Sequence, residues 1–561
     1  MLPADWPPDR RPDGSPADWP PDRPQDGRDR RRRRVPRRRP THRAARDLPR
    51  LQPRRVGRDR RRRLVYDLEP VVLRRLLQRE LALTDQVERL TLSLRAAGLR
   101  SGNSVALVLP NSLELLVLCL ALPRAGLIAA PLNPAYKADE LRGFAADIEA
   151  RAIVTGDGNQ VVADAVAGLA VPKWTSSTDP SGEVRMAGIR SASQGALGEP
   201  NADDVALFLH TSGTEGQPKV VPLTHANVLL SAQHIAAHYA LTPADRSLVV
   251  LPLFHGHGLI GAALSTLASG GAVIVPHRFS ASRFWQSFRQ HGATWYSAVP
   301  TIHQILLERA DADHAPYSGA RFIRSCSAAL APVVLCELER RFGAPVIEAY
   351  GLTEASHQVA SNPLPPRARR LGSVGFGTGA EIAIIDSHGH YLPAHSTGEV
   401  VIRGPTVMRG YHNNPAANTA AFVDGWLRTG DVGVLDDDGY LTLIGRVKEM
   451  INRGGEKISP TEIEEVLLAH PAVADAAAFG APDSKYGEEV EAAVVLKGNA
   501  DPEAPAVVLP RTARRLQGAK GDPDCLRVAD ECDGQGGPAC PRCALPAHGL
   551  TAKRGGACDE G

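Results

Sequence analysis

The chain lacks an apolar run long enough to cross a membrane as a helix, which argues against an integral helical membrane protein. Its best candidate, residues 113–132, is interrupted by Pro123 and Arg124 and therefore predicts a buried helix followed by a strand. The apolar run of a secretory signal is also missing near the first residues. What remains, with 43% hydrophobic and 23% charged residues, is the composition of an ordinary soluble enzyme.

Lysine is absent from residues 1–64, although this segment contains 22 arginines. The stretch 3–10 recurs at 16–23, and nine aspartates argue against an organelle transit peptide. A composition so rich in arginine and proline cannot bury a core. We therefore expect a disordered arm, or translated sequence that does not belong to the mature protein. The arginine run 30–34 could instead bind nucleic acid or an anionic membrane, but we expect no nucleic-acid partner.

Cysteine is scarce before residue 525. Cys119, Cys326 and Cys336 lie in apolar or loop contexts and suggest reduced thiols in a cytoplasmic compartment. The other five crowd the last 37 residues. A peroxisomal address stays open if the native C-terminus differs.

From about Val65 onward, short apolar runs alternate with helical sequence, which predicts α/β layers with largely parallel sheets. A helix is expected from Asn111 to Leu120. The expected buried strands are residues 104–109, 151–155, 207–210, 247–251 and 272–275.

The sequence pattern changes near residue 398, where alternating helices and strands give way to short strands and turns. Strands at 398–402 and 440–444 lie among Gly, Asp and Asn turns and predict a small β-barrel-like part. After Gly445 we expect a small, mobile α+β domain, with a helix that begins at the capping stretch 459–462 and ends near His470. The expected division is an arm (1–64), a large domain (65–445), a truncated small domain (446–503) and a tail (504–561).

A loop rich in hydroxyl groups and glycine follows the strand expected at 207–210. Residues 211–219 combine such residues with one lysine, so their backbone N–H groups can face a polyphosphate. The glycine spacing and the ending of a Walker A motif are absent.

This loop resembles the signature of the adenylate-forming superfamily, which includes acyl-CoA synthetases, firefly luciferases and non-ribosomal adenylation domains. Glu215 and Val220 depart from the family's usual residues at their positions. The likeness plausibly covers residues 86–500 and makes the large domain an AMP-binding adenylation domain. Five further blocks follow in the family's order, at residues 252–259, 325–332, 348–354, 426–431 and 445–451.

The resemblance implies an ATP-dependent carboxylate–CoA ligase that works through an acyl-AMP intermediate and uses ATP, CoA and Mg²⁺. Because a carboxylate must approach a triphosphate, cations and donors are needed where negative charge develops. The catalytic residues implied are Lys219, Thr353, Glu354 and His255, with Glu354 also holding Mg²⁺. The nucleotide-binding residues implied are Thr211, Ser212, Gly213, Thr214, Glu348, Tyr350, Gly351, Asp431 and Arg446.

Three residues are implied for the joint between the domains and for CoA. Lys448 occupies the family's hinge position, where a flexible joint lets the small domain swing between two poses. Gly454 and Gly455 are expected near the pantetheine arm of CoA, although a glycine pair can equally form a plain turn.

The expected acid-binding residues are His257, Ser327 and His357. Such donors suit a short, doubly charged acid better than a long apolar tail. The amino-acid sequences of the motifs resemble those of the oxalate–CoA ligases of plants and fungi, so oxalate is the favoured acid. Three alternatives remain: packing of these side chains around AMP, a medium-chain fatty acid ligase and a 4-coumarate-like ligase. The oligomeric state is open.

The end of the chain departs from the family pattern, in which a Pro-x-x-x-Thr-Gly-Lys stretch carries a catalytic lysine. No such stretch follows Lys497, but the codons of 529–536 read one nucleotide later permit it. We therefore expect the native frame to be lost between about 498 and 516, and the tail beyond to be disordered and free of zinc despite its cysteines. Adenylation by such a chain should be poor. A nucleotide-binding pseudoenzyme is the alternative if this tail is real.

Overall fold

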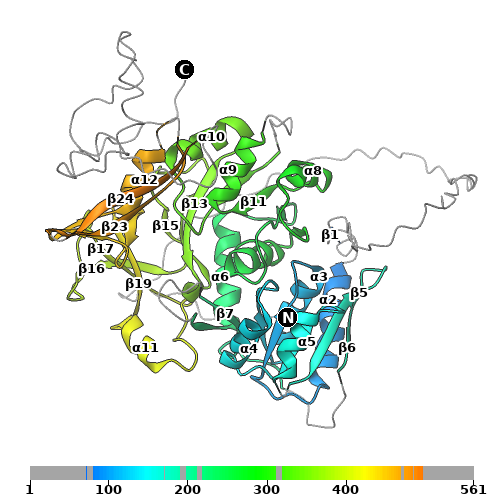
Figure 1. The fold of residues 1–561 in the computed structure, drawn as a ribbon. Helices are drawn as coiled ribbons and strands as arrows, with labels where there is room; N and C mark the ends of the chain where they lie inside the picture. Colours follow the sequence, from blue (N-terminus) through cyan, green and yellow to red (C-terminus); the bar gives the residue numbers. More distant parts are fainter. Residues whose placement is uncertain are drawn as a thin grey trace, which may run out of the picture. The chain divides into compact units, whose positions relative to one another are not determined.

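The computed structural model describes residues 71–72, 80–169, 171–189, 198–211, 218–310, 319–468, 470, 473–483 and 485–496 (Figure 1). The arm expected at 1–64 and the cysteine-rich tail at 504–561 lie outside these residues. None of the helices so described is long and apolar enough to span a bilayer.

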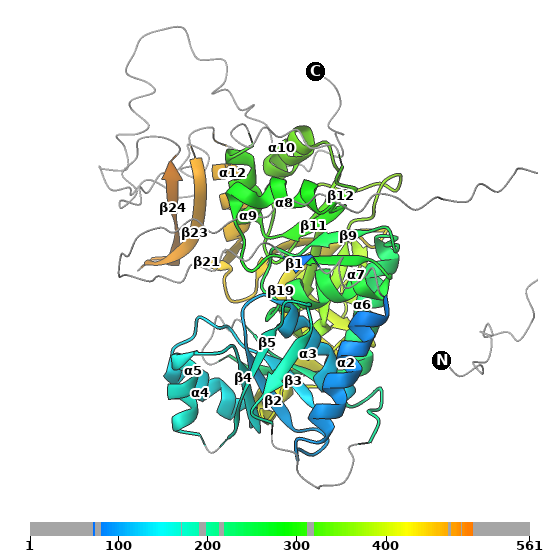
Figure 2. The same cartoon turned by 90° about the vertical axis from the view of Figure 1, so that its right-hand side faces the viewer.

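The first sheet has the strand order β6-β5-β4-β2-β3-β7-β8 among the described residues, with parallel pairing from β5 to β7. In β2, Val105 and Leu107 pack into one core with α2 and α3, whereas Ala106 and Val108 pack with α4 and α5. Figure 2 shows these two helix pairs on opposite sides of the strands. The strands are β2 (Ser104–Val108), β3 (Ile128–Pro131), β4 (Ala152–Thr155), β5 (Lys173–Thr178), β6 (Val184–Ala187), β7 (Val205–His210) and β8 (Val220–Thr224); the helices are α2 (Glu80–Arg95), α3 (Leu113–Arg124), α4 (Ala138–Asp147) and α5 (Gln160–Ala167).

The second sheet has the order β1-β10-β9-β11-β12-β13-β14-β15 in the described part of the chain and is parallel from β10 to β13. Several predicted site residues lie at or just beyond the carboxyl ends of its strands, as is common in α/β proteins. The strands are β1 (Val71–Val72), β9 (Arg246–Leu248), β10 (Ala272–Val275), β11 (Trp295–Ala298), β12 (Phe322–Ser325), β13 (Val346–Leu352), β14 (His357–Ser361) and β15 (Phe376–Gly377); the α-helices between them are α6 (His225–His238), α7 (Ser265–Ala268), α8 (Phe284–Gln290), α9 (Pro300–Glu308) and α10 (Pro332–Phe342).

A third, antiparallel sheet forms the part expected to be barrel-like. A fourth sheet and α12 make the small C-terminal unit, whose own core includes Ile451, Ile463 and Val490. As predicted, α12 begins at its capping residue, because the Ser459 hydroxyl accepts the N–H of Glu462 at 3.2 Å. The elements are β16 (Glu381–Ile385), β17 (Gly398–Arg403), α11 (Pro415–Ala421), β18 (Phe422–Val423), β19 (Trp426–Leu435), β20 (Leu441–Arg446), β21 (Ile451–Arg453), β22 (Glu456–Ile458), α12 (Pro460–Leu468), β23 (Val473–Asp483) and β24 (Gly487–Leu496).

The two largest differences from the expected boundaries concern one helix and one strand. The helix expected from Asn111 begins after Ser112, which caps it, and runs on to Arg124. Asn111 instead makes two long-range hydrogen bonds. Its Nδ2 donates to the oxygen of Leu251 at 2.9 Å, and its Oδ1 accepts the N–H of Leu253 at 2.8 Å. The strand expected at 247–251 ends at Leu248 as β9.

The spacing of apolar residues in the sequence also did not predict the π-helix His257–Leu264. Such helices are rare and are often found at functional sites. Here it begins at one of the predicted acid-binding residues.

Candidate active site

The ends of the predicted phosphate loop are held together by β7 and β8. Thr211 donates its N–H to the oxygen of Lys219 at 3.0 Å, and its hydroxyl accepts the N–H of Lys219 at 3.1 Å. His210 and Val220 are register partners on the two strands. This pairing leaves Lys219 exposed at the base of the loop, as a phosphate-binding lysine requires. Ser212, Gly213 and Thr214 lie outside the described residues.

Tyr411 connects the predicted phosphate lysine to the predicted metal carboxylate. Its hydroxyl donates to Oε1 of Glu354 at 2.8 Å, and Nζ of Lys219 lies 4.9 Å from the centre of its ring. Burial, followed by the charge of Glu354, raises the pKa of Tyr411, so the phenol stays protonated and donates. The sequence analysis missed Tyr411, which lies 57 residues from Glu354.

One carboxylate oxygen of Glu354 is therefore oriented by Tyr411, and the other has no partner among the described residues. No cluster of three or more acidic, His or Cys ligands occurs there either. This donor set fits Mg²⁺, which is usually held by one or two carboxylates together with substrate phosphates and water. Thr353 lies beside Glu354, at the start of the 3₁₀ turn Thr353–Ala355.

The predicted nucleotide residues Tyr350, Asp431 and Arg446 come together. The Tyr350 hydroxyl donates to one oxygen of the Asp431 carboxylate, and Nε of Arg446 donates to the other at 3.0 Å. Asp431 and Arg446 are register partners on β19 and β20. Burial raises the pKa of Asp431, against the hydrogen bonds from Tyr350 and Arg446, which lower it.

Glu348 and Gly351 also lie on β13, which carries Tyr350. Burial raises the pKa of Glu348 to about 8, so its carboxyl is mostly protonated at neutral pH. At Gly351 a Cβ atom would lie 1.6 Å from the carbonyl oxygen of His357, so only glycine lets β13 and β14 approach this closely.

The three predicted acid-binding residues form one hydrogen-bonded group. Nδ1 of His257 lies 2.9 Å from the Ser327 hydroxyl, and the rings of His257 and His357 stack with centroids 4.8 Å apart. The histidines are buried, at 6% and 5% exposure, whereas Ser327 is exposed. Burial, with neighbouring positive charge, holds the pKa of both histidines well below the usual range, so both rings are neutral.

The backbone around this group is strained. Ser327 has φ 75°, Ser356 has φ 54° and His357 has φ 90°. Residues with a Cβ atom rarely occupy this region, and such strain tends to occur at functional sites. Two of the three predicted acid-binding side chains are therefore presented from unusual backbone conformations.

A buried arginine that the sequence analysis missed lies behind these histidines. Arg324, at the end of β12, is fully buried, and its Nη2 lies 2.9 Å from Nε2 of His357. No carboxylate forms an ion pair with it in the described part of the chain. A buried charge without a counter-ion costs several kcal/mol, so an anion entering this site would be stabilised.

His255 lies outside that network. Its side chain is exposed, and its ring centroid lies 4.5 Å from that of Phe254. Neither its exposure nor this ring contact assigns it a catalytic role, which stays a prediction.

The predicted joint lies between β20 and β21. Arg446 ends β20, and its oxygen accepts the N–H groups of Glu449 and Met450, both at 3.0 Å, in a turn that contains Lys448. Lys448 also lines a hollow of about 340 Å³ with Glu464 and Glu488.

Gly454 and Gly455 form the two-residue turn between β21 and β22, where Arg453 pairs with Glu456. Both have positive φ, 62° and 95°, which this kind of hairpin turn demands. The hairpin thus accounts for both glycines, and their contact with CoA remains a prediction.

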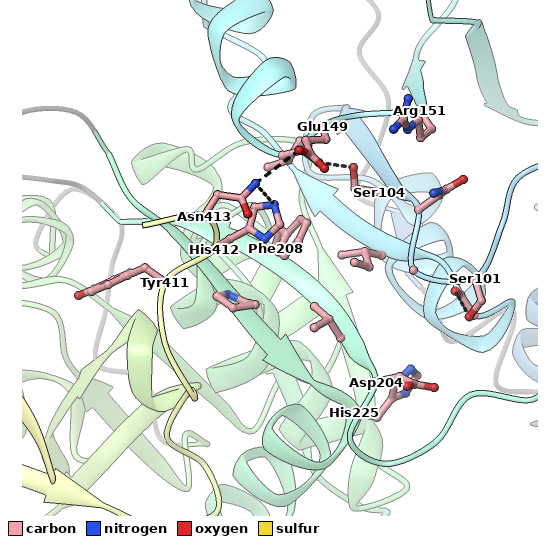
Figure 3. Close-up of a pocket in the computed structure, with 17 residues that line it drawn as sticks. Ser101, Ser104, Glu149, Arg151, Asp204, Phe208, His225, Tyr411, His412 and Asn413 are labelled. Carbon is pink, nitrogen blue, oxygen red and sulfur yellow. Dashed lines mark hydrogen bonds between the residues drawn. The ribbon is translucent and has the colours of Figure 1, made fainter. Parts of the chain in front are cut away.

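A further hollow of about 630 Å³ opens beside the first sheet (Figure 3). On its wall the amide nitrogen of Asn413 contacts Glu149 at 3.5 Å and His412 at 3.2 Å. None of the predicted site residues lines it, although Tyr411 does. The described residues predicted from the sequence lie elsewhere: on β13, β14, β19 and β20, in the segments that follow β12 and β13, at 255–257, at the ends of the 211–219 loop and between β20 and β22.

Residues 81–412 match the family described as AMP-binding enzyme, and residues 462–531 match the AMP-binding enzyme C-terminal domain.

Two curated relatives act on short acids. The chain is 48% identical over 423 residues to an oxalate–CoA ligase of Arabidopsis thaliana, covering 74% of this chain and 82% of that protein. It is 42% identical over 420 residues to a sulfoacetate–CoA ligase of Cupriavidus necator, covering 74% and 82%. Among solved structures, the o-succinylbenzoate CoA synthetase of Bacillus subtilis in complex with ATP and magnesium ion superposes with a TM-score of 0.65, at 31% identity over 75% of this chain and 85% of that one.

Proposed function

Because the chain belongs to the AMP-binding enzyme family and is an acid–thiol ligase that forms an acyl adenylate, we propose that its acid is oxalate. The reaction would convert oxalate, ATP and CoA to oxalyl-CoA, AMP and pyrophosphate. One oxalate carboxylate attacks the α-phosphorus and expels pyrophosphate. The CoA thiolate then attacks the activated carbonyl carbon and expels AMP.

The observation that carries this proposal is the buried positive charge of Arg324 behind the donors of His257, Ser327 and His357. Oxalate keeps a second carboxylate after the first has reacted, and that anion needs a cation and donors. A long apolar or aromatic acid would bring no negative charge to the guanidinium and no acceptor to Nδ1 of His357, and a donor left without a partner costs about 1–3 kcal/mol. The relatives that act on oxalate and on sulfoacetate support a short acid of this kind.

The remaining residues divide between the nucleotide and the thiol. Lys219 and Thr211 would hold the terminal phosphates, and Glu354, oriented by Tyr411, would hold Mg²⁺, which neutralises phosphate charge when bound. Tyr350, Asp431 and Arg446 would hold the adenosine, with the Asp431 carboxylate exchanging its present partners for ribose hydroxyls. Gly454 and Gly455 would approach CoA after the small domain turns about Lys448.

The test is pyrophosphate release with oxalate, sulfoacetate, malonate, 4-coumarate and octanoate. The protein should carry a C-terminal reading frame confirmed on the transcript. We expect oxalate to give the highest kcat/KM, with the aromatic and fatty acids near background. A preference for 4-coumarate or octanoate would refute the proposal, and a preference for sulfoacetate would reassign the same site to that acid.

A further inference from the structure

Arg324 donates hydrogen bonds to four side chains. Nε donates to the hydroxyl of Tyr239 at 2.9 Å, Nη1 to the hydroxyl of Ser297 at 3.0 Å, and Nη2 to Oε1 of Gln358 at 2.8 Å and to Nε2 of His357 at 2.9 Å. A guanidinium has five N–H donors and no acceptor. Every one of these partner atoms must therefore accept.

The first consequence concerns His357. If its Nε2 accepts from Arg324, the proton of the neutral ring must be on Nδ1. Nδ1 has no hydrogen-bond partner among the described residues. It is therefore a donor with its hydrogen still unused.

The second consequence passes through Ser297. Its hydroxyl accepts from Arg324 and lies 2.6 Å from Nε2 of His257. Within the described residues no other acceptor lies within bonding distance of this hydroxyl, so its hydrogen is satisfied by donating to Nε2 of His257. The proton of His257 is then on Nδ1 and is donated to Ser327 at 2.9 Å.

Ser327 ends this chain of hydrogen bonds at the surface. Its oxygen accepts from His257, which leaves its own hydrogen for a further acceptor. Along both branches each hydrogen bond points away from Arg324. Such chains polarise one another and strengthen the terminal donors.

We propose that Arg324 is a positioning residue: it fixes both His257 and His357 as Nδ1–H tautomers, so that the Ser327 hydroxyl and Nδ1 of His357 are presented as donors to the acid's carboxylate oxygens. The role toward the acid rests on the proposed function, whereas the tautomers are a property of the free protein. Lysine could not replace Arg324, because one ammonium cannot reach the same fixed, planar set of acceptors.

The surroundings of Arg324 keep the relay in one protonation state. The ionisable groups that interact with it are Tyr239, Cys326, His238, His257, His303 and His357. Burial lowers the pKa of His303 to about 4 and raises the pKa of Tyr239, so these two are neutral near pH 7. Burial, joined by the positive charge of Arg324, keeps both histidine rings neutral.

The test is nitrogen NMR of the full chain labelled at histidine with ¹⁵N, without substrate. The shifts of the ring nitrogens distinguish a protonated nitrogen from one with a free lone pair, and His257→Gln and His357→Gln assign the two rings. We expect both rings to be neutral and protonated on Nδ1. A protonated Nε2 on either ring would overturn the inference, whether or not oxalate is a substrate.

Ser297→Ala divides the two branches. It should let His257 populate the Nε2–H form while His357 keeps its proton on Nδ1. Oxalate affinity, measured by calorimetry with α,β-methylene-ATP present, should fall about tenfold through the lost charge-assisted donor. The matched control is Ser265→Ala, a buried serine whose hydroxyl binds only the backbone oxygens of Gly261 and Ala262 and whose loss should change neither result.

In Arg324→Lys, both histidine rings should populate the Nε2–H form as well as the Nδ1–H form. If the Arg324→Lys variant does not fold, Ser297→Ala still decides the question. An unchanged His257 tautomer in Ser297→Ala would contradict the relay. Nδ1–H rings in a protein that binds no short diacid would support the tautomer assignment and refute the proposed function.

Discussion

The hydroxyl of Tyr411 donates to Oε1 of Glu354 at 2.8 Å, across 57 residues of sequence. Lys219 lies over the same ring, 4.9 Å from its centre. One aromatic side chain thus fixes the carboxylate expected to hold Mg²⁺ and contacts the lysine expected to hold phosphate. The two halves of the proposed phosphate site are therefore contacted by one residue.

Removing the Tyr411 hydroxyl should weaken the binding of Mg²⁺ by Glu354. Tyr411→Phe should lower the rate of pyrophosphate exchange about tenfold at low Mg²⁺ and less at high Mg²⁺, since a hydrogen bond to a charged group contributes about 1.5–3 kcal/mol. The measurement is a Mg²⁺ titration of the exchange rate. Tyr391→Phe, at a tyrosine with 60% exposure, is the control and should match the parent protein. Equal loss at all Mg²⁺ concentrations would show that Tyr411 does not act through the metal carboxylate.

The two charged groups themselves should matter far more. Lys219→Ala and Glu354→Ala should each reduce adenylation by about a hundredfold or more, because each removes charge stabilisation from the phosphoryl transfer. Circular dichroism should show an intact fold, since Lys219 is exposed and Glu354 is only half-buried. Lys173→Ala, at an exposed lysine on β5, is the matched control. Near-normal exchange in either variant would remove that residue from the site.

Substitutions in the group of His257, Ser327 and His357 should weaken binding of the acid and leave binding of the nucleotide unchanged. Ser327→Ala and His357→Ala should raise the KM for oxalate about tenfold or more and leave the KM for ATP nearly unchanged, because each loses a donor to a charged oxygen. Steady-state kinetics with each substrate varied in turn gives both constants. Equal rises in both would mean that these side chains serve the nucleotide.

Glu348 should make the fold less stable as pH rises. Burial raises its pKa from 4.5 to about 8, so the folded protein binds a proton there that the unfolded chain releases above about pH 4.5. This residue's contribution is therefore fully present below pH 4.5 and is lost as pH rises towards 8. In urea unfolding between pH 5 and 8, Glu348→Gln should show a smaller fall in stability than the parent.

Glu381→Gln is the control, and its slope of stability between pH 5 and 8 should match that of the parent. The hydrogen bond from Arg403 lowers the pKa of Glu381, so its contribution is present above the unfolded value of 4.5 and is lost as pH falls. A parent and a Glu348→Gln protein with identical pH slopes would contradict a neutral, buried Glu348.

Much of this architecture could be predicted from the chain because its signals are local. Apolar runs marked β2, β4 and β10, and the capping stretch at Ser459 marked the start of α12. The family resemblance grouped Tyr350, Asp431 and Arg446 as nucleotide-binding residues, and their side chains do form one hydrogen-bonded cluster.

The rest could not be predicted because it depends on burial and on distant pairing. Arg324 lies in the short run Phe-Ile-Arg-Ser, where an arginine at a strand end would ordinarily be solvated. Its partners Tyr239 and Ser297 are 85 and 27 residues away. The π-helix that begins at His257 has no periodic signature of its own, so the sequence predicted the histidine but not the conformation that directs it.

The acyl adenylate is tested most directly by the fate of the acid's oxygen. If oxalate labelled with ¹⁸O is incubated with ATP, Mg²⁺ and CoA, the oxygen that attacks the α-phosphorus stays with AMP when the thiolate displaces it. Mass spectrometry should therefore find one ¹⁸O atom in each AMP molecule formed, together with oxalyl-CoA. AMP without label, or labelled AMP formed from 4-coumarate but not from oxalate, would contradict the account.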